Sequence, residues 1–164
     1  MTITNETKIS KATEGYSVII TRDFNAPLAK IWRAWTEPEL LDKWWAPKPM
    51  YIETQKMDFT AGGKWIFIMN FPDGNKIGYR VNFDEIDPKN SFKSSGGPAD
   101  FEGNIAPETP QMKRVTKFMA DGDVTHVEIQ IFFENEAHMQ AVAEGASKGT
   151  AAAFTNLDEF LETI

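Results

Sequence analysis

The side chains able to do acid–base or metal chemistry in this sequence are few and scattered. The two histidines, His126 and His138, have no spacing that makes a metal site or a catalytic dyad. His126 alternates with Glu128 and Gln130, a pattern that favours a solvent-facing place on a strand. The sequence has no nucleophile elbow, no HExxH pair and no phosphate-binding loop. We therefore expect no catalytic residue, no metal and no cofactor, and the residue inventory favours a non-enzymatic protein.

Asp58, Tyr79 and Thr150 are the polar residues that a reactive site inside a pocket could use. Asp58 precedes the turn Ala61-Gly62-Gly63, where a carboxylate commonly accepts backbone N–H groups. Acid or base catalysis by Asp58 at the mouth of a cavity is the alternative interpretation. Because the sequence shows no partner for such chemistry, we expect the structural role.

Aromatic and thioether side chains are unusually abundant, with 12 Phe, 5 Trp and 7 Met, and 12% of all residues are aromatic. Such side chains suit either a thick core or an adaptable apolar pocket. In 64–71 and 77–86 the residues alternate as they do on strands with one buried face. One face of the first strand holds Trp65, Phe67 and Met69, and one face of the second holds Tyr79, Val81 and Phe83.

Two short helices are predicted directly after a first strand at 17–24. Asn25-Ala26-Pro27 opens the first helix, because asparagine caps well and proline is tolerated in the first turn. A capping box between Thr36 and Glu39 opens the second helix. The two helices are expected to run to about Trp35 and Trp44.

Trp44 and Trp45 cannot share one helix face, so at most one of them belongs fully to the core. The other is expected at a cavity rim or over the sheet edge.

Before the first strand, residues 1–15 are expected to be a flexible lead-in to a single domain at 16–164.

The chain from 50 to 133 is predicted to form strands separated by turns. Their expected ranges are 50–58, 64–71, 77–86, 91–94, 112–119 and 124–133. The segment 95–111 holds three glycines and three prolines and reads as a long loop. Loops longer than ~12–15 residues in a compact domain are usually functional or disordered. We expect this loop to roof part of a cavity, with Phe101 as a candidate lid residue.

The C-terminal run, 136–164, contains no proline, and its last half predicts an amphipathic helix. The apolar face is predicted to hold Phe154, Leu157, Leu161 and Ile164, which leaves Thr155, Asn156, Asp158, Glu159 and Glu162 for solvent. Upstream, the residues that could face the sheet are small: Ala143, Ala146, Gly149, Ala151 and Ala153. Gly145 and Gly149 predict a break, with a short helix near 136–144 and a main helix from about 147.

Bulk composition excludes several classes of protein. A length of 164 residues suits one domain with a sizeable core. The formal net charge of −7 argues against nucleic-acid binding. There are no cysteines, no signal-peptide pattern and no apolar run of membrane-spanning length, so a cytoplasmic location is expected. Composition leaves the oligomeric state open.

Several motifs in this order resemble the START-like (SRPBCC) superfamily. They are 24–27 (FNAP), 31–40 (IWRAWTEPEL), 43–47 (KWWAP), 57–59 (MDF), 62–65 (GGKW), 72–74 (PDG), 85–88 (EIDP) and 101–104 (FEGN), with Gly149, Leu157 and Leu161 at the end. Specifically, the chain is similar to the bacterial branch related to the C-terminal domain of the Aha-type heat-shock-protein ATPase activator. The resemblance covers about 17–163 and implies an α+β helix-grip fold, in which a bent antiparallel sheet wraps a long C-terminal helix around a cavity.

The sequence departs from the family pattern at three places. Thr60-Ala61 stand where the family has Arg-Pro, Ala46 stands where it has glycine, and Gly149-Thr150 stand where it has Gly-Trp. Loss of that tryptophan would enlarge the cavity or change its lining.

A small hydrophobic-ligand binding protein is the leading expectation, with an unidentified ligand in an apolar cavity. The predicted ligand contacts are Trp35, Trp44, Trp65, Phe67, Met69, Tyr79, Val81, Phe83, Phe101, Phe118, Thr150 and Phe154. Two alternatives stay open. One is a protein-partner module, as the co-chaperone resemblance implies, and the other is a polyketide cyclase-like enzyme, as some superfamily members are.

Overall fold

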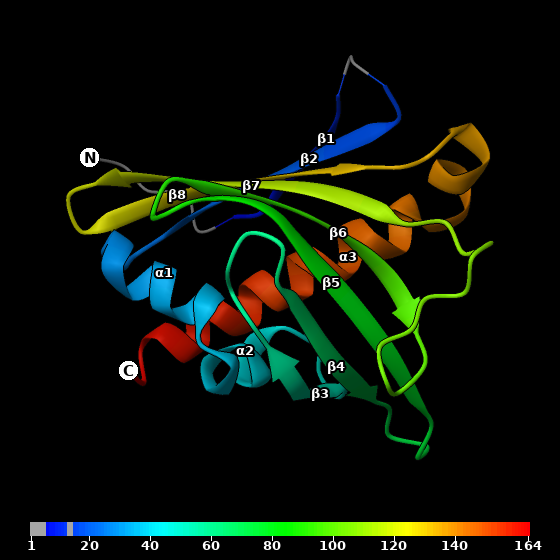
Figure 1. Cartoon of the computed structure of the whole chain (residues 1–164). Helices are drawn as coiled ribbons and strands as arrows, with labels where there is room; N and C mark the ends of the chain where they lie inside the picture. Colours follow the sequence, from blue (N-terminus) through cyan, green and yellow to red (C-terminus); the bar gives the residue numbers. More distant parts are fainter. Residues whose placement is uncertain (1–5, 13–14) are drawn as a thin grey trace.

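A single bent antiparallel sheet holds a long helix on its concave side. This computed structural model describes residues 6–12 and 15–164. Their sheet has eight strands in the order β1-β2-β8-β7-β6-β5-β4-β3. The strands are β1 (Lys8–Lys11), β2 (Ser17–Phe24), β3 (Tyr51–Met57), β4 (Lys64–Asn70), β5 (Lys76–Asp87), β6 (Ser91–Ala99), β7 (Met112–Asp121) and β8 (Val124–Phe132). The helices, α1 (Leu28–Thr36), α2 (Pro38–Trp44) and α3 (Glu136–Leu161), lie on the same side of the sheet (Figure 1).

The predicted order of elements from the first long strand onward is confirmed, and so is the helix-grip class. One strand was not expected. Within the predicted lead-in, residues 8–11 form β1, which pairs antiparallel with β2 through Lys8↔Thr21 and Lys11↔Val18. Residues 1–5 and 13–14 of that lead-in lie outside the described residues. Among the residues that are described, no helix is long and apolar enough to cross a membrane.

The predicted caps of the two short helices are wrong. Pro27, not Asn25, is the N-cap residue of α1, and no side chain caps that end. The Thr36 hydroxyl donates to the carbonyl of Trp32 at 2.8 Å instead of accepting from Glu39. Glu37 is the shared residue that ends α1 and begins α2. Because one residue serves both helices, Thr36 belongs to the last turn of α1 and is not free to cap α2.

The C-terminal helix is continuous, so the predicted break near Gly145 and Gly149 is wrong. A helical glycine costs only about 1 kcal/mol relative to alanine, and the surrounding Ala, Glu and Met residues are strong helix formers. The Asn135 side chain caps the start by accepting from the backbone N–H of His138 at 2.8 Å. The helix therefore spans the concave face as one rigid element (Figure 1).

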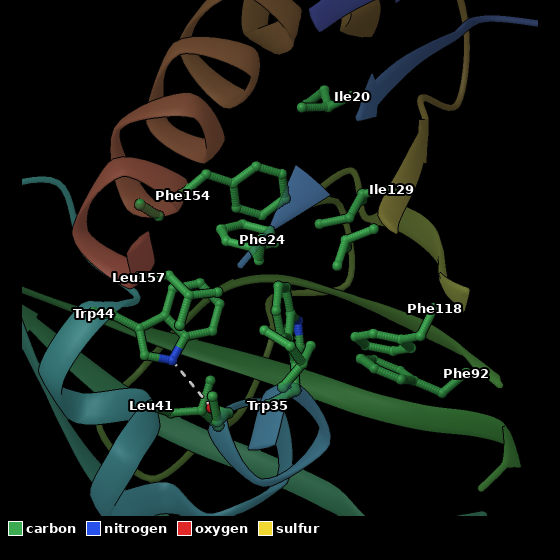
Figure 2. Close-up of a cluster of buried hydrophobic side chains, with 14 of the residues drawn as sticks. Ile20, Phe24, Trp35, Leu41, Trp44, Phe92, Phe118, Ile129, Phe154 and Leu157 are labelled. Atoms are coloured by element: carbon green, nitrogen blue, oxygen red, sulfur yellow. Dashed lines mark hydrogen bonds between the residues drawn. The ribbon is translucent and has the colours of Figure 1, made fainter. Parts of the chain in front are cut away.

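The second half of α3 supplies the centre of the core. Phe154 lies edge-on to Phe24 with ring centroids 5.3 Å apart, and Leu157 is fully buried (Figure 2). Two predictions about this helix are wrong. Asn156 is buried rather than solvent-facing, because its Nδ2 donates to the carbonyl of Ala46 at 2.7 Å. Ile164 lies beyond the end of α3 and is 40% exposed.

Candidate functional site

A small cavity lies on the concave side between the two short helices and the strands β4 to β8. Its volume is about 20 Å³, which is room for one water molecule. Most of the lining is apolar and aromatic. The lining residues are Trp35, Leu41, Trp45, Trp65, Val81, Phe83, Phe92, Ser94, Arg114, Thr116 and Ile129.

Arg114 is the one charged residue of this lining. It lies on β7 in the alternating set that includes Thr116 and Phe118, both of which are buried on the concave side. Within the described part of the chain, its guanidinium has neither an ion pair nor a hydrogen bond. Its Cζ lies 5.8 Å from the centroid of the Trp45 ring, within the range of a cation–π contact.

Burial lowers the pKa of the Arg114 guanidinium to about 10. The group stays protonated at neutral pH. Burial also raises the pKa of the Tyr79 hydroxyl, and the charge of Arg114 opposes that rise. Tyr79 therefore stays a neutral hydroxyl in the electrostatic field of an unpaired cation.

Two buried hydroxyls share the cavity with this cation. Ser94 and Thr116 are 6% and 2% exposed, and no hydrogen bond joins either side chain to another described residue. Ser94 lies directly opposite Arg114 in the β6–β7 ladder. Among the described residues, the one fully buried side-chain atom without a hydrogen-bond partner is Arg22 Nε, so the polar atoms of Arg114, Ser94 and Thr116 are open to the cavity rather than sealed in the core. Three polar side chains therefore face one small, mostly apolar space.

Sequence reasoning missed this polar group. The alternation of Met112, Arg114, Thr116 and Phe118 was a usable signal, since Phe118 was already placed in the pocket. That alternation puts Arg114 on the same face as Phe118. The predicted ligand contacts included the hydroxyls of Tyr79 and Thr150 but not Arg114, Ser94 or Thr116, which line the cavity.

The structure divides the predicted ligand contacts into four groups. Trp35, Trp65, Val81 and Phe83 line the cavity. Trp44, Phe67, Phe118 and Phe154 are buried in the surrounding core, and Met69 and Tyr79 pack against it half-buried. The Thr150 hydroxyl donates to the carbonyl of Ala146 within α3. Phe101 is 51% exposed. Contact of any of these residues with a ligand stays a prediction.

Trp44 and Trp45 occupy different environments, as the helix geometry requires. Trp44 is 1% exposed, and its Nε1 donates to the carbonyl of Ala34 at 3.0 Å (Figure 2). Trp45 ends α2 half-buried and lines the cavity, with its ring 5.3 Å from that of Trp65. Trp45, and not the predicted contact Trp44, is the member of the pair that lines the cavity.

The expected lid over the cavity is not there. Residues 95–99 of the predicted loop belong to β6, so the loop is shorter and starts at 100. Gly103, with φ +89°, packs so closely on the Ile66 side chain that a Cβ would collide with it. Ile66 pairs with Arg80 on the outer face of the sheet, opposite to Trp65 and Phe67. The loop therefore covers the outer face and does not roof the cavity.

A hydrogen-bonded chain from α2 holds Trp65 in the lining. The Thr54 hydroxyl donates to Asp42 Oδ1 at 2.6 Å, and the Thr54 Oγ1 accepts from Trp65 Nε1 at 3.0 Å. Trp65 is 3% exposed, so bulk water cannot replace Thr54 as the acceptor for its N–H. Asp42 and Thr54 are thus positioning residues for one wall of the cavity.

Replacing Thr54 with valine leaves the Trp65 N–H without an acceptor and keeps the side-chain shape. We expect the free energy of unfolding to fall by about 1–3 kcal/mol, the usual cost of a buried unsatisfied donor. Urea denaturation measures this. Gln55→Val on the same strand is the control, and because Gln55 is exposed it should change stability by no more than about 0.5 kcal/mol. Equal effects of the two variants would contradict the positioning role.

The polar residues proposed for chemistry are not gathered at one place. Asp58 is exposed in its turn and accepts from the Thr60 hydroxyl at 3.0 Å. His126 lies on the outer face, 37% exposed, with Nδ1 2.6 Å from Asp23 Oδ1. The His138 Nδ1 accepts from the backbone N–H of Glu134 at 3.1 Å. Among the described residues, no group of three or more His, Asp or Glu side chains could hold a metal ion.

A bent antiparallel sheet that wraps a long C-terminal helix, with a small lined space on its concave side, defines a helix-grip protein. The family model described as "Activator of Hsp90 ATPase homolog 1-like protein" matches residues 25–162. The chain belongs to this family, within the START-like superfamily that the sequence motifs indicated. A comparison with curated proteins found no match.

Solved structures from several bacteria share the fold. A solution structure from Arthrobacter aurescens is 28% identical, with a TM-score of 0.88 over 96% of this chain and 92% of that one. A crystal structure from Mycobacterium smegmatis is 24% identical, with a TM-score of 0.85 and coverage of 94% and 95%. A third, from Nitrosomonas europaea, is 25% identical, with a TM-score of 0.76 and coverage of 90% and 94%. Their names state no ligand or activity.

Proposed function

We propose that this protein binds a small hydrophobic molecule on the concave side of its sheet. The observation that carries the proposal is a cavity left open among aromatic rings in an otherwise closely packed core. Three tryptophans from different elements, Trp35, Trp45 and Trp65, line it together with phenylalanines of β5 and β6. Concave, mostly apolar spaces with a few polar groups are the usual form of small-molecule sites.

A ligand larger than one water has to enlarge this cavity as it binds. None of the described methionines is in the lining, but Met50, Met57, Met69, Met112 and Met139 pack half-buried against the surrounding core and could repack to make room. Methionine is unbranched and repacks easily. Burying apolar ligand surface stabilises the complex by ~25 cal/mol per Å², less the cost of rearranging these side chains. The proposal therefore predicts a binding site that opens around its ligand.

Thermal unfolding in the presence of uncharged hydrophobic compounds tests the proposal. The panel contains 2-naphthylmethanol and straight-chain alcohols of increasing length. We expect at least one compound to raise the melting temperature saturably, because a ligand that binds only the folded state stabilises it. Quenching or shift of tryptophan fluorescence should follow the same concentration dependence, since three tryptophans line the site.

A pair of matched substitutions shows whether binding occurs in the cavity. Val81→Trp places a large ring into the lining, whereas Val115→Trp places the same ring on the outer face of β7, in register with Lys93. Val81→Trp should abolish the ligand-dependent shift, and Val115→Trp should retain it. If no compound shifts the wild-type protein, the cavity is a packing defect and the proposal is wrong.

The description of the matching family favours one second candidate, a protein-partner module. The net charge of −7 would suit a basic surface on such a partner. Failure of every compound together with saturable binding to a purified Hsp90-type ATPase would favour this candidate. A cytoplasmic location is part of both proposals.

A further inference from the structure

We propose that the ligand is a flat apolar carboxylate whose anionic group is bound by Arg114, Ser94 and Thr116. This inference rests on the proposed function and names the chemical class of the ligand. The three side chains belong to two adjacent strands, β6 and β7, and all three line the same cavity. They would give the apolar pocket one polar end.

The arginines Arg22 and Arg114 both lie on the concave side of the sheet and differ in their ion pairing. Within the described residues, the buried Arg22 of β2 has a counter-ion, since its Nη2 lies 3.2 Å from Asp158 Oδ2. Arg114 has no such partner, and neither do the buried hydroxyls of Ser94 and Thr116. Arg114 is half-buried, and the polar atoms of all three side chains open onto the cavity, since none of them is a sealed, unpartnered atom of the core. Their hydrogen-bonding capacity is thus directed at the cavity and available to a ligand.

The shape of the group matches a carboxylate. A guanidinium presents parallel N–H donors that bind both oxygens of a carboxylate at once. Ser94, directly opposite Arg114 in the ladder, and Thr116, two residues further along β7, each supply a hydroxyl donor. A single water in the 20 Å³ cavity can satisfy some of these donors but cannot neutralise the charge.

The aromatic rings beside Arg114 suit a flat ligand body. The Trp45 ring lies under the guanidinium and 5.3 Å from the Trp65 ring, which is 4.3 Å from the ring of Phe67. These rings form a continuous row that leads from the charged end of the lining along β4. A planar apolar molecule with its carboxylate on Arg114 would have its body against this row.

Calorimetric titration with two matched compounds tests the inference. The compounds are 2-naphthoate and 2-naphthylmethanol, which share the same ring system and differ in the anionic group. We expect the wild-type protein to bind 2-naphthoate at least about tenfold more tightly, which is the effect expected of one charge-assisted hydrogen-bonded pair. Arg114→Met should remove this preference, because the methionine keeps most of the apolar stem and lacks the charge.

Two further variants keep the test specific. Lys117→Met lies on the same strand and removes the same charge from the exposed outer face, so it should leave the preference for 2-naphthoate intact. Thr116→Val should reduce the preference several-fold without removing it, because one donor is lost and the charge stays. The melting temperature of ligand-free Arg114→Met should equal or exceed that of wild type, since an unpaired cation is removed.

These measurements distinguish a failure of anion recognition from a failure of hydrophobic ligand binding. Equal binding of both compounds by wild type and Arg114→Met would overturn anion recognition and leave the hydrophobic binding proposal standing. A large fall in the melting temperature of Arg114→Met would show a structural role for the arginine and would also overturn the inference. Absence of binding of either compound to the wild type, with no shift from the wider panel, would overturn both proposals.

Discussion

Replacing Trp44 with alanine lowers the free energy of unfolding by about 3–5 kcal/mol, the range for deleting a large buried aromatic side chain. Trp44 is 1% exposed and packs edge-on against Trp35, with ring centroids 4.6 Å apart. Its Nε1 holds the carbonyl of Ala34 at 3.0 Å and so links α2 to α1 (Figure 2). Alanine leaves a cavity and an unpaired carbonyl at the point where both short helices meet the core.

Trp45→Ala is the matched control, because the same side chain is removed one residue away. Trp45 is half-buried, and its side chain makes no hydrogen bond to another described residue, so we expect a loss of only about 1–2 kcal/mol. Guanidinium denaturation followed by circular dichroism measures both. Trp44→Phe should fall between wild type and Trp44→Ala. Similar losses for the two alanine variants would mean that Trp44 does not join the helices to the core as the structure shows.

Removing the carboxylate of Asp158 is the second large effect that we expect. Arg22 is 8% exposed, its Nη2 lies 3.2 Å from Asp158 Oδ2, and its buried Nε has no hydrogen-bond partner among the described residues. Asp158→Ala leaves this guanidinium buried without a counter-ion. Such a loss costs about 3–5 kcal/mol in a fully buried pair. Because Asp158 is 33% exposed, we expect the free energy of unfolding of Asp158→Ala to fall by about 2–3 kcal/mol.

Replacing the arginine instead of the carboxylate should lower the free energy of unfolding much less. In Arg22→Met, the methionine fills most of the space of the arginine stem, and the remaining carboxylate can be hydrated. We expect a loss of about 1 kcal/mol or less. The double variant should resemble Arg22→Met, since the buried cation is absent from both. Urea denaturation of the three variants gives the comparison, and a greater loss for Arg22→Met than for Asp158→Ala would contradict this account.

Local periodicity accounts for most of what could be predicted about the fold. Alternation in 64–71 and 77–86 placed Trp65 and Val81 on one face, and both line the cavity. The three-and-four spacing of Phe154, Leu157 and Leu161 likewise placed them on the buried face of α3. These patterns are readable because a strand or helix fixes which side chains share a face. The order of the motifs added the family and, with it, the closure of the sheet around α3.

Predictions failed where the outcome depended on a partner distant in sequence. Asn156 has the polarity of a surface residue and is buried, because the carbonyl of Ala46 accepts from its amide. The break at Gly145 did not form, because the continuous helix bridges the concave face. The loop around Phe101 crosses to the outer face, because Gly103 packs on Ile66.

The sequence by itself determined the class of the fold, the aromatic wall of the concave face and the absence of a recognisable catalytic motif. Only the tertiary structure decided that Trp45 rather than Trp44 lines the cavity, and that Arg114, Ser94 and Thr116 face it with no ion pair or side-chain hydrogen bond to another described residue. The physical reason is that periodicity assigns a side chain to a face, whereas its neighbours come from other strands and helices. Whether a polar side chain on that face is paired, hydrated or left for a ligand depends on those neighbours alone.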